Sequence, residues 1–210
     1  FAFAGALLAA LVVHAVGRGR SNDPIRLVLA GVAFGAVLEG VGQGLALVNP
    51  QAFDVLRGRN VGNLDIGTLA PVLVAGGFVA VGLLFAVAST RGLNAMALGD
   101  EVATALGARL GLTRALALAA ITLTAGAASA VAGVIVFLGL MVPHVARRLC
   151  GPDQRWVLAF SVVLGPAILI LADVIGRLVL PGELPAGVVV AFVGAPVLIA
   201  LARRRRVIAL

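Results

Sequence analysis

The sequence predicts an all-α fold, a polytopic transmembrane helical bundle that forms a single domain over residues 1–210. Hydrophobic residues make up 61% of the chain and charged residues only 12%, whereas about a quarter of the residues in a soluble domain are charged. The mean hydropathy is +1.14. The apolar residues form long continuous runs, not the alternating pattern of a membrane barrel, so each run predicts a helix that satisfies its own backbone hydrogen bonds in lipid.

Six apolar runs are candidates for membrane crossings, because a bilayer core needs about 20 helical residues. The first run is short, and the chain begins without Met or a basic leader, so it does not resemble a signal peptide. We therefore expect an N-terminally truncated chain. The runs cover residues 1–16, 27–48, 66–89, 115–142, 156–172 and 186–202.

The orientation of these helices is predicted by the Arg residues, because short loops rich in Arg stay on the cytoplasmic side. The chain has no Lys, and 13 of its 16 basic residues gather in four places. The gaps at 49–65 and 181–185 carry balanced or acidic charges, which suits the outside. The C-terminus is thus predicted to be cytoplasmic. The four groups are Arg18, Arg20 and Arg26; Arg91, Arg109 and Arg114; Arg147, Arg148 and Arg155; and Arg203 to Arg206.

The run 115–142 is long for one helix and short for two. Two Arg-rich groups flank this run, and both can be cytoplasmic only if an even number of crossings separates them. Gly133 and Pro143 suggest where the chain turns. We expect one full helix to about Gly133 and then a short return helix that ends near Arg147, with non-helical backbone at membrane depth. The alternative is one tilted helix, which would place the last two Arg groups outside.

The segment 91–114 is too long and too patterned for a simple connector. Its apolar residues recur at helical spacing, and Gly99, Gly107 and Gly111 are predicted to divide it into two or three short helices. Asp100 and Glu101 suit a helix start, where carboxylates interact favourably with the helix dipole. We interpret the segment as a cytoplasmic loop that inserts into a groove of a soluble partner. The alternative is a helix lying on the membrane surface, which usually carries basic residues on its polar face.

Glu39 and Gln43 lie one turn apart within the run 27–48. An ionisable group inside a membrane helix costs several kcal/mol to bury in lipid and is a functional candidate for that reason. The pair either faces a substrate passage or forms an internal hydrogen bond that fixes packing, and the sequence favours neither.

Three Arg residues are predicted on the outer side. Asp173 and Arg177 are one turn apart, and a structural ion pair is the favoured interpretation. Arg57 and Arg59 are candidates to receive an acidic docking partner or to meet lipid headgroups.

Several classes of function are excluded by what the sequence lacks. No Gly-rich nucleotide loop ending in GK[ST] and no Ser/His/Asp set outside the apolar runs is present, so the chain is predicted to be non-catalytic. One Cys and two His cannot form a four-ligand zinc site, so no metal site is expected. The Arg residues are spread along the chain between the apolar runs, which argues against nucleic-acid binding. Active transport would then need an ion gradient or a separate ATPase subunit.

Four stretches together resemble the permeases of iron-siderophore, haem and cobalamin ABC importers, the FecCD-type family. They are MALGDEVATALG (96–107), AVAGVIVFLGLMVPHVARRLCGPDQR (130–155), LADVIGRLVLPGELPAGVV (171–189) and GAPVLIALARRR (194–205). The resemblance runs from about residue 5 to the C-terminus and is most specific in FLGLMVPHVARR and ELPAGVV. The stretch EGVGQGLALVNPQAFDVLRGRNVGNLDIG departs from the family pattern, which leaves the substrate open.

The resemblance implies a bacterial inner-membrane permease with about ten helices, of which this chain would hold the last seven. It implies two permease copies or homologues, two ATPase subunits and an extracytoplasmic substrate-binding protein. ATP would bind to the ATPase partner, and no cofactor would bind to this chain. Glu101, Ala103 and Gly107 match the E-x-A-x-x-x-G pattern that such permeases place against the ATPase. The implied docking residues are Leu98, Gly99, Asp100, Glu101, Ala103, Leu106 and Gly107, and Arg57, Arg59 and Arg177 are candidates for binding-protein docking.

The favoured function is therefore the permease subunit of an ATP-driven importer of an iron-siderophore or similar metal chelate, working by alternating access. One alternative is a gradient-driven secondary transporter in which Glu39 is the proton or substrate site and 91–114 is a linker. Another is a membrane scaffold that transports nothing.

Overall fold

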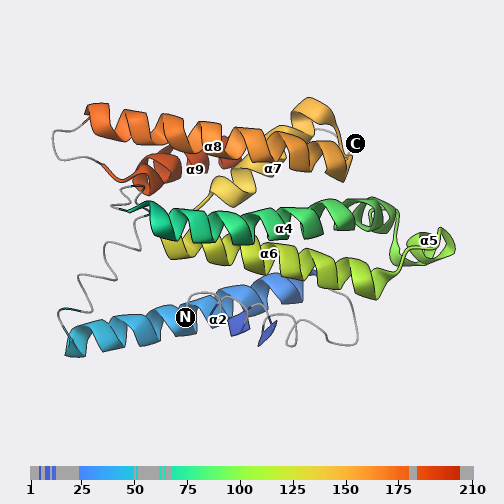
Figure 1. Ribbon diagram of the computed structural model, residues 1–210, viewed down its shortest axis with the longest axis horizontal. Coiled ribbons are helices and arrows are strands. Elements are labelled where there is room, and N and C mark those ends of the chain that lie inside the picture. The colour runs from blue at the N-terminus through green and yellow to red at the C-terminus, as the bar shows by residue number, and fades with distance from the viewer. Residues whose placement is uncertain are drawn as a thin grey trace.

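The computed structural model describes residues 24–49, 68–179 and 184–203, together with the single positions 5, 8, 9, 11, 12, 51, 62 and 64. In this part of the chain the fold is all-α, as predicted (Figure 1). Its helices are α2 (Pro24–Val48), α4 (Leu69–Met96), α5 (Asp100–Ala105), α6 (Leu110–Ala132), α7 (Leu138–Cys150), α8 (Gln154–Val179) and α9 (Ala186–Arg203).

Four of these helices, α2, α4, α6 and α8, are long and apolar enough to cross a membrane, and α9 contains a shorter apolar segment. They correspond to five of the six apolar runs, with the run 115–142 divided between α6 and α7. Most of the first predicted crossing, residues 1–16, lies outside the described residues, so the total of seven spans stays a prediction.

The chain breaks between α6 and α7. α6 is followed by Gly133, whose φ of 74° lies in the left-handed region, and α7 is preceded by Phe137 with φ of 69°. The backbone at 133–136 is not helical. α7 has 13 residues and runs back toward the end of the molecule where α6 began (Figure 1). The predicted long helix followed by a short return helix is confirmed, and the alternative of one tilted helix is wrong.

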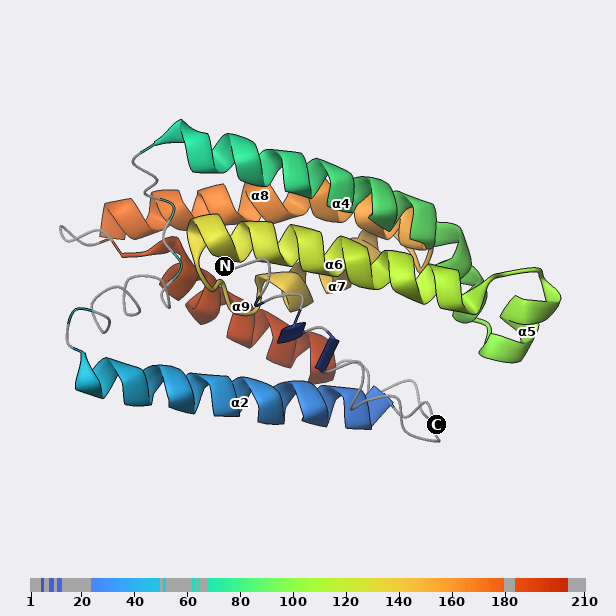
Figure 2. The ribbon, with the colours of Figure 1, turned by 60° about the horizontal axis from the view of Figure 1, so that its bottom comes forward.

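Because of this break, two connections between helices that are distant in sequence lie at the same end of the bundle. The α4–α6 connection, which carries α5, and the turn from α7 to α8 are at one end (Figure 1). The α6–α7 break and the end of α8 are at the other end (Figure 2). The Arg-rich ends of these helices therefore share one side of the bundle, as the orientation argument requires.

Helices α4, α5 and α6 form one body, which we call the hairpin body. α4 and α6 run antiparallel and pack side by side (Figure 2). Small residues allow this close approach, since a Cβ atom at Gly82 would lie 2.7 Å from Cγ2 of Thr124, and one at Gly92 would collide with Thr113. Ser89 is buried in this body and its hydroxyl donates to the carbonyl of Ala86, 2.8 Å away, so its polar atom is satisfied within α4.

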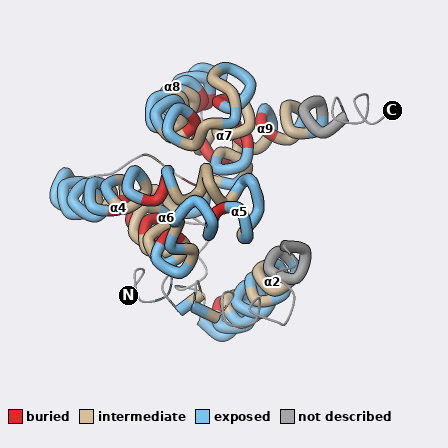
Figure 3. The backbone as a smooth tube through the Cα atoms, turned by 90° about the vertical axis from the view of Figure 1, so that its right-hand side faces the viewer, coloured by how far each residue is buried: buried red, intermediate tan, exposed pale blue. Residues whose placement is uncertain are grey.

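Helices α7, α8 and α9 form a second body (Figure 3). Its core holds Ala172 of α8 and Val189 and Val190 of α9, with Leu138 of α7 and Leu169 of α8 packed against them. The first turn of α7 is thus anchored to both longer helices of this body. α2 lies apart from both bodies, and nearly all of its described side chains are at least partly exposed (Figure 3).

The two bodies meet where α4 packs against the start of α8. Asn94 Nδ2 donates to Asp153 Oδ1 over 2.7 Å, and Asn94 Oδ1 accepts the backbone N–H of Gln154 over 2.8 Å. Asp153 Oδ1 also accepts the backbone N–H of Arg155 over 2.9 Å, while its carbonyl accepts the first helical bond of α8, from Val157. Asp153 is therefore the N-cap of α8, and Asn94 of α4 completes the cap.

The close contact at Gly82 predicts a loss of stability in Gly82→Val. The new side chain would meet Thr124, whose Oγ1 is held by a 2.8 Å hydrogen bond to the carbonyl of Ala120, so rotating it away breaks that bond. Overpacking of this kind costs about 1–3 kcal/mol. The thermal unfolding midpoint in detergent should fall for Gly82→Val and stay unchanged for Gly77→Val, where nothing lies within 4 Å of the added Cβ. Equal midpoints would contradict the packing described for α4 and α6.

The cap at Asp153 predicts a pH-dependent contribution to stability. The hydrogen bond from the Arg155 backbone, followed by that from Asn94, holds the pKa of the Asp153 carboxyl below its usual range. A lowered pKa supplies stability that is present above the unfolded value of about 3.9 and is lost as the pH falls through the folded value. Unfolding midpoints of wild type and Asp153→Asn should differ at neutral pH and converge below about pH 4. A difference in midpoint that stays constant with pH contradicts the assignment of the ionised Asp153 as the N-cap of α8.

Candidate functional site

The structure places one separate short helix, α5 (Asp100–Ala105), beyond the ends of the long helices (Figures 1 and 2). The prediction of two or three short helices in 91–114 is wrong. α4 continues to Met96, and Gly111 lies inside α6. Gly99 and Gly107 adopt φ of 103° and 82°, whereas Gly111 is not among the residues with positive φ. The two glycines that leave helical geometry are the ones that delimit α5.

Both ends of α5 are formed by defined backbone contacts. The Ala103 N–H donates to the carbonyl of Gly99 over 2.9 Å at the start. At the end, the Gly107 N–H donates to Thr104 and the Ala108 N–H donates to Ala103, each over 2.9 Å. This pair of bonds around a left-handed glycine is a Schellman motif, which stops a helix and satisfies its last carbonyls. α5 is consequently a closed unit of fixed length.

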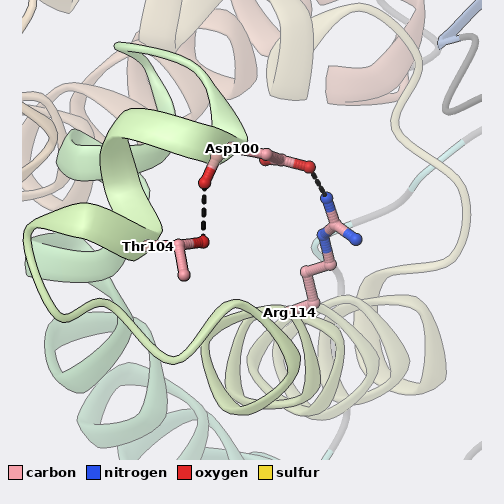
Figure 4. A network of polar contacts seen from close by, with 3 residues as sticks. All are labelled: Asp100, Thr104 and Arg114. Atoms are coloured by element: carbon pink, nitrogen blue, oxygen red, sulfur yellow. Dashed lines mark hydrogen bonds and ion pairs between the residues drawn. The ribbon is translucent and has the colours of Figure 1, made fainter.

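An ion pair joins α5 to α6, and one residue of α5 is fully buried. Asp100 Oδ2 lies 2.6 Å from a guanidinium nitrogen of Arg114 on α6, and the Thr104 hydroxyl donates to the Asp100 carbonyl over 2.7 Å (Figure 4). Ala103 has no exposed surface. The predicted position of Asp100 and Glu101 in the first turn is confirmed. Among the predicted docking residues, Asp100 and Ala103 thus hold the helix in place.

Three apolar residues on α5 and at its two ends form an exposed surface. Val102 lies within α5, Leu106 is its C-cap residue, and Leu98 lies in the turn just before Gly99. Their exposed fractions are 64%, 46% and 66%. Glu101 is exposed beside them. An apolar surface of this kind, on a short helix beyond the end of the bundle, has the shape and chemistry of a ridge that enters a groove of another protein. The docking role of these residues stays a prediction.

Glu39 and Gln43 are both exposed on α2, and Gln43 Nε2 lies 3.4 Å from Glu39 Oε1. The structure brings the two side chains together, and their role in a passage stays a prediction. Arg177 Nε donates to Asp173 Oδ2 over 2.9 Å, so the predicted ion pair within α8 is present. Both residues lie in the last two turns of α8, and that end of α8 is opposite α5 (Figure 1). Arg57 and Arg59 lie outside the described residues.

The contact of Asn94 with Asp153 and Gln154 was not predicted from the sequence. The GPD sequence before α8 does carry a helix-start signal, because Asp is a preferred N-cap. No local pattern indicates that its partner lies 59 residues earlier, at the end of α4. In the part of the chain that the structure describes, no group of three or more His, Cys, Asp or Glu side chains could hold a metal ion.

Comparison with known proteins gives consistent relatives. The chain is 49% identical to the ferric enterobactin transport system permease protein FepD of Escherichia coli over 97% of its own length and 62% of that protein's. It is 36% identical to a siderophore transport system permease protein, YfiZ, of Bacillus subtilis, covering 96% of this chain and 62% of the relative. It is also 36% identical to the cobalamin import system permease protein BtuC of Halobacterium salinarum, covering 100% and 57%. The chain thus spans about three-fifths of the length of these relatives.

A solved chain from an inward-facing conformation of a metal-chelate type ABC transporter has a TM-score of 0.76 with this structure, covering 96% of this chain and 73% of that one at 21% identity. This likeness supports the fold. The model of the FecCD transport family matches residues 1–204, nearly the whole sequence. The chain therefore belongs to the FecCD transport family.

Proposed function

We propose that this chain is the membrane-spanning part of a permease subunit in an ABC importer, and that the importer carries an iron-siderophore or a similar metal chelate across the cytoplasmic membrane. The observation that carries the proposal is the exposed apolar surface of α5 and its two ends, formed by Leu98, Val102 and Leu106 beyond the end of the bundle. The names of the relatives, among them permeases for ferric enterobactin and cobalamin, support the substrate class.

The proposed mechanism is alternating access driven by separate ATPase subunits. ATP binds and is hydrolysed on those subunits, and this chain is a non-catalytic translocation subunit that binds no cofactor itself. Movement of the ATPases is passed to α5, and α5 is joined to α6 through the ion pair of Asp100 with Arg114. A force on α5 therefore acts on the hairpin body instead of bending a loose loop. Helices around the passage then change the side to which it opens.

We propose different partners for the two ends of the bundle. ATPase subunits dock on α5 at the cytoplasmic end, and a cytoplasmic C-terminus is part of the same proposal. An extracytoplasmic substrate-binding protein docks at the opposite end, with Arg57, Arg59 and Arg177 as candidate contacts. A second permease copy or homologue packs in the membrane, and the exposed surface of α2 is available to it or to lipid. Glu39 and Gln43 are the candidates for the translocation path.

The proposed function predicts how the bundle is oriented in the membrane. In a Cys150→Ser background, Leu98→Cys and Leu149→Cys should react with a membrane-impermeant thiol reagent only from the cytoplasmic side, and Leu178→Cys only from outside. All three leucines are well exposed, at 64%, 64% and 80%. Labelling of sealed vesicles of each orientation checks this. Reaction of the residue 98 and residue 149 cysteines from opposite sides would refute the shared cytoplasmic end.

The proposed function also predicts that the ATPase docks on α5 and its two ends. Leu98→Ala with Leu106→Ala should reduce the ATPase that co-purifies in mild detergent by at least about tenfold, because two leucines lose their burial in the partner. Leu178→Ala with Val179→Ala is the matched control, since these exposed residues lie at the other end of α8. Equal recovery of ATPase from both variants, with uptake intact, favours the alternative of a gradient-driven transporter. In that case Glu39→Gln should abolish uptake.

A further inference from the structure

Asn94 of α4 forms hydrogen bonds with the start of α8. It lies in the last turn of α4, five residues before Gly99, and both polar atoms of its side chain are bonded to the start of α8. The distances, 2.7 Å to Asp153 Oδ1 and 2.8 Å to the Gln154 nitrogen, are those of well-formed hydrogen bonds. α4 leads directly into α5, and α8 follows directly from α7. The contact therefore joins the docking segment to the second body.

The contact uses both the donor and the acceptor of the Asn94 carboxamide. The N–H groups of Gln154 and Arg155 lie in the first turn of α8 and have no partner within the helix. Asp153 accepts from Arg155, and the carbonyl oxygen of Asn94 accepts from Gln154, while the Asn94 amide donates to the Asp153 carboxylate. A carboxamide donates from its nitrogen and accepts at its oxygen, so it serves two separate groups at once. Without it, one N–H and one carboxylate lose a partner.

The contact made by Asn94 lies beside a pocket between the two bodies. This open pocket of about 470 Å³ lies between the hairpin body and the second body and is lined by Ala86 of α4, Ala120 of α6, Val142 of α7 and Leu158 of α8. Leu93 and Gln154 also line it, so Asn94 stands at its margin. The bodies are thus joined where α4 meets α8, and not through close packing along their whole length.

We propose that Asn94, with Asp153, is the positioning link that makes α7 and α8 follow the docking helix α5 during transport. The inference rests on the proposed function and adds the route by which the movement of α5 leaves the hairpin body. When α5 is displaced with α4, the Asn94 carboxamide carries the start of α8 and the end of α7 with it. Without the link, α5 and the hairpin body move while the second body stays behind.

A set of four variants isolates the link. N94D places a carboxylate opposite the Asp153 carboxylate and removes the donor, so it should separate the two bodies. N94D/D153N provides a carboxamide at position 153 that donates to the new carboxylate at position 94, and should restore the link. D153N alone keeps an acceptor oxygen for Asn94 and should remain coupled. N94A removes the link without introducing repulsion.

The measurement is the distance between spin labels at L112C on α6 and L149C on α7, in a C150S background, with the permease assembled with its ATPase. Both leucines are exposed, at 53% and 64%. In wild type, D153N and N94D/D153N, the distance should be the same without nucleotide and after trapping with ADP and vanadate. In N94D and N94A, it should shift or broaden on trapping. A purely structural role of Asn94 would lower the amount of assembled complex without this nucleotide dependence.

Transport gives a second readout, with ferric enterobactin as the probe. N94D should carry about tenfold less chelate per ATP hydrolysed, since the hydrogen bond to Asp153 is lost and two carboxylates then face each other, and N94D/D153N should recover. The proposal is overturned if assembled N94D or N94A matches wild type, or if N94D/D153N behaves like N94D. A wild-type permease that binds no ATPase contradicts the proposed function itself, which distinguishes the two failures.

Discussion

The structure depends on the break between α6 and α7. Backbone groups in a bilayer must be satisfied within the protein, so an apolar run of 28 residues would by default form one continuous helix. Gly133 and Phe137 interrupt it by adopting positive φ, and α7 then returns toward the side from which α6 came. Had α6 continued through the run, the start of α8 would lie about 30 Å away, across the bilayer core, from the end of α4. The break thus makes the contact of Asn94 with Asp153 geometrically possible.

The short helix α5 also depends on tertiary contacts. A helix of six residues is far too short to be stable alone, since isolated helices below about 12 residues are marginal in water. Its order comes from its attachments, namely the buried Ala103, the ion pair of Asp100 with Arg114, and the Schellman motif at Gly107. With these residues committed to attachment, Leu98, Val102 and Leu106 are left facing outward. Attachment and the proposed recognition of a partner therefore use different residues of α5 and its two ends.

Most of the fold could be predicted from the sequence, because continuous apolar runs permit few alternatives in lipid. The errors arise where tertiary packing outweighs local pattern. The apolar run ends at Ser89, yet α4 continues to Met96, because Gly92 packs against Thr113 and Asn94 is held by α8. Gly111 costs about 1 kcal/mol of helix propensity relative to Ala, but packing of α6 against α4 retains the helix there. The partner of Asp153 could not be predicted, since no local signal specifies a contact 59 residues away.

The E-x-A-x-x-x-G pattern can now be divided by the physical role of each position. Ala103 is completely buried, so a larger side chain there would push α5 out of its place in the hairpin body. Gly107 adopts φ of 82°, which a residue with a Cβ reaches only with strain, so it fixes where α5 ends. Glu101 alone of the three presents its side chain as an exposed charge. Two of the three positions therefore encode the rigidity of α5, which the proposed transmission of movement from α5 through α4 to Asn94 requires.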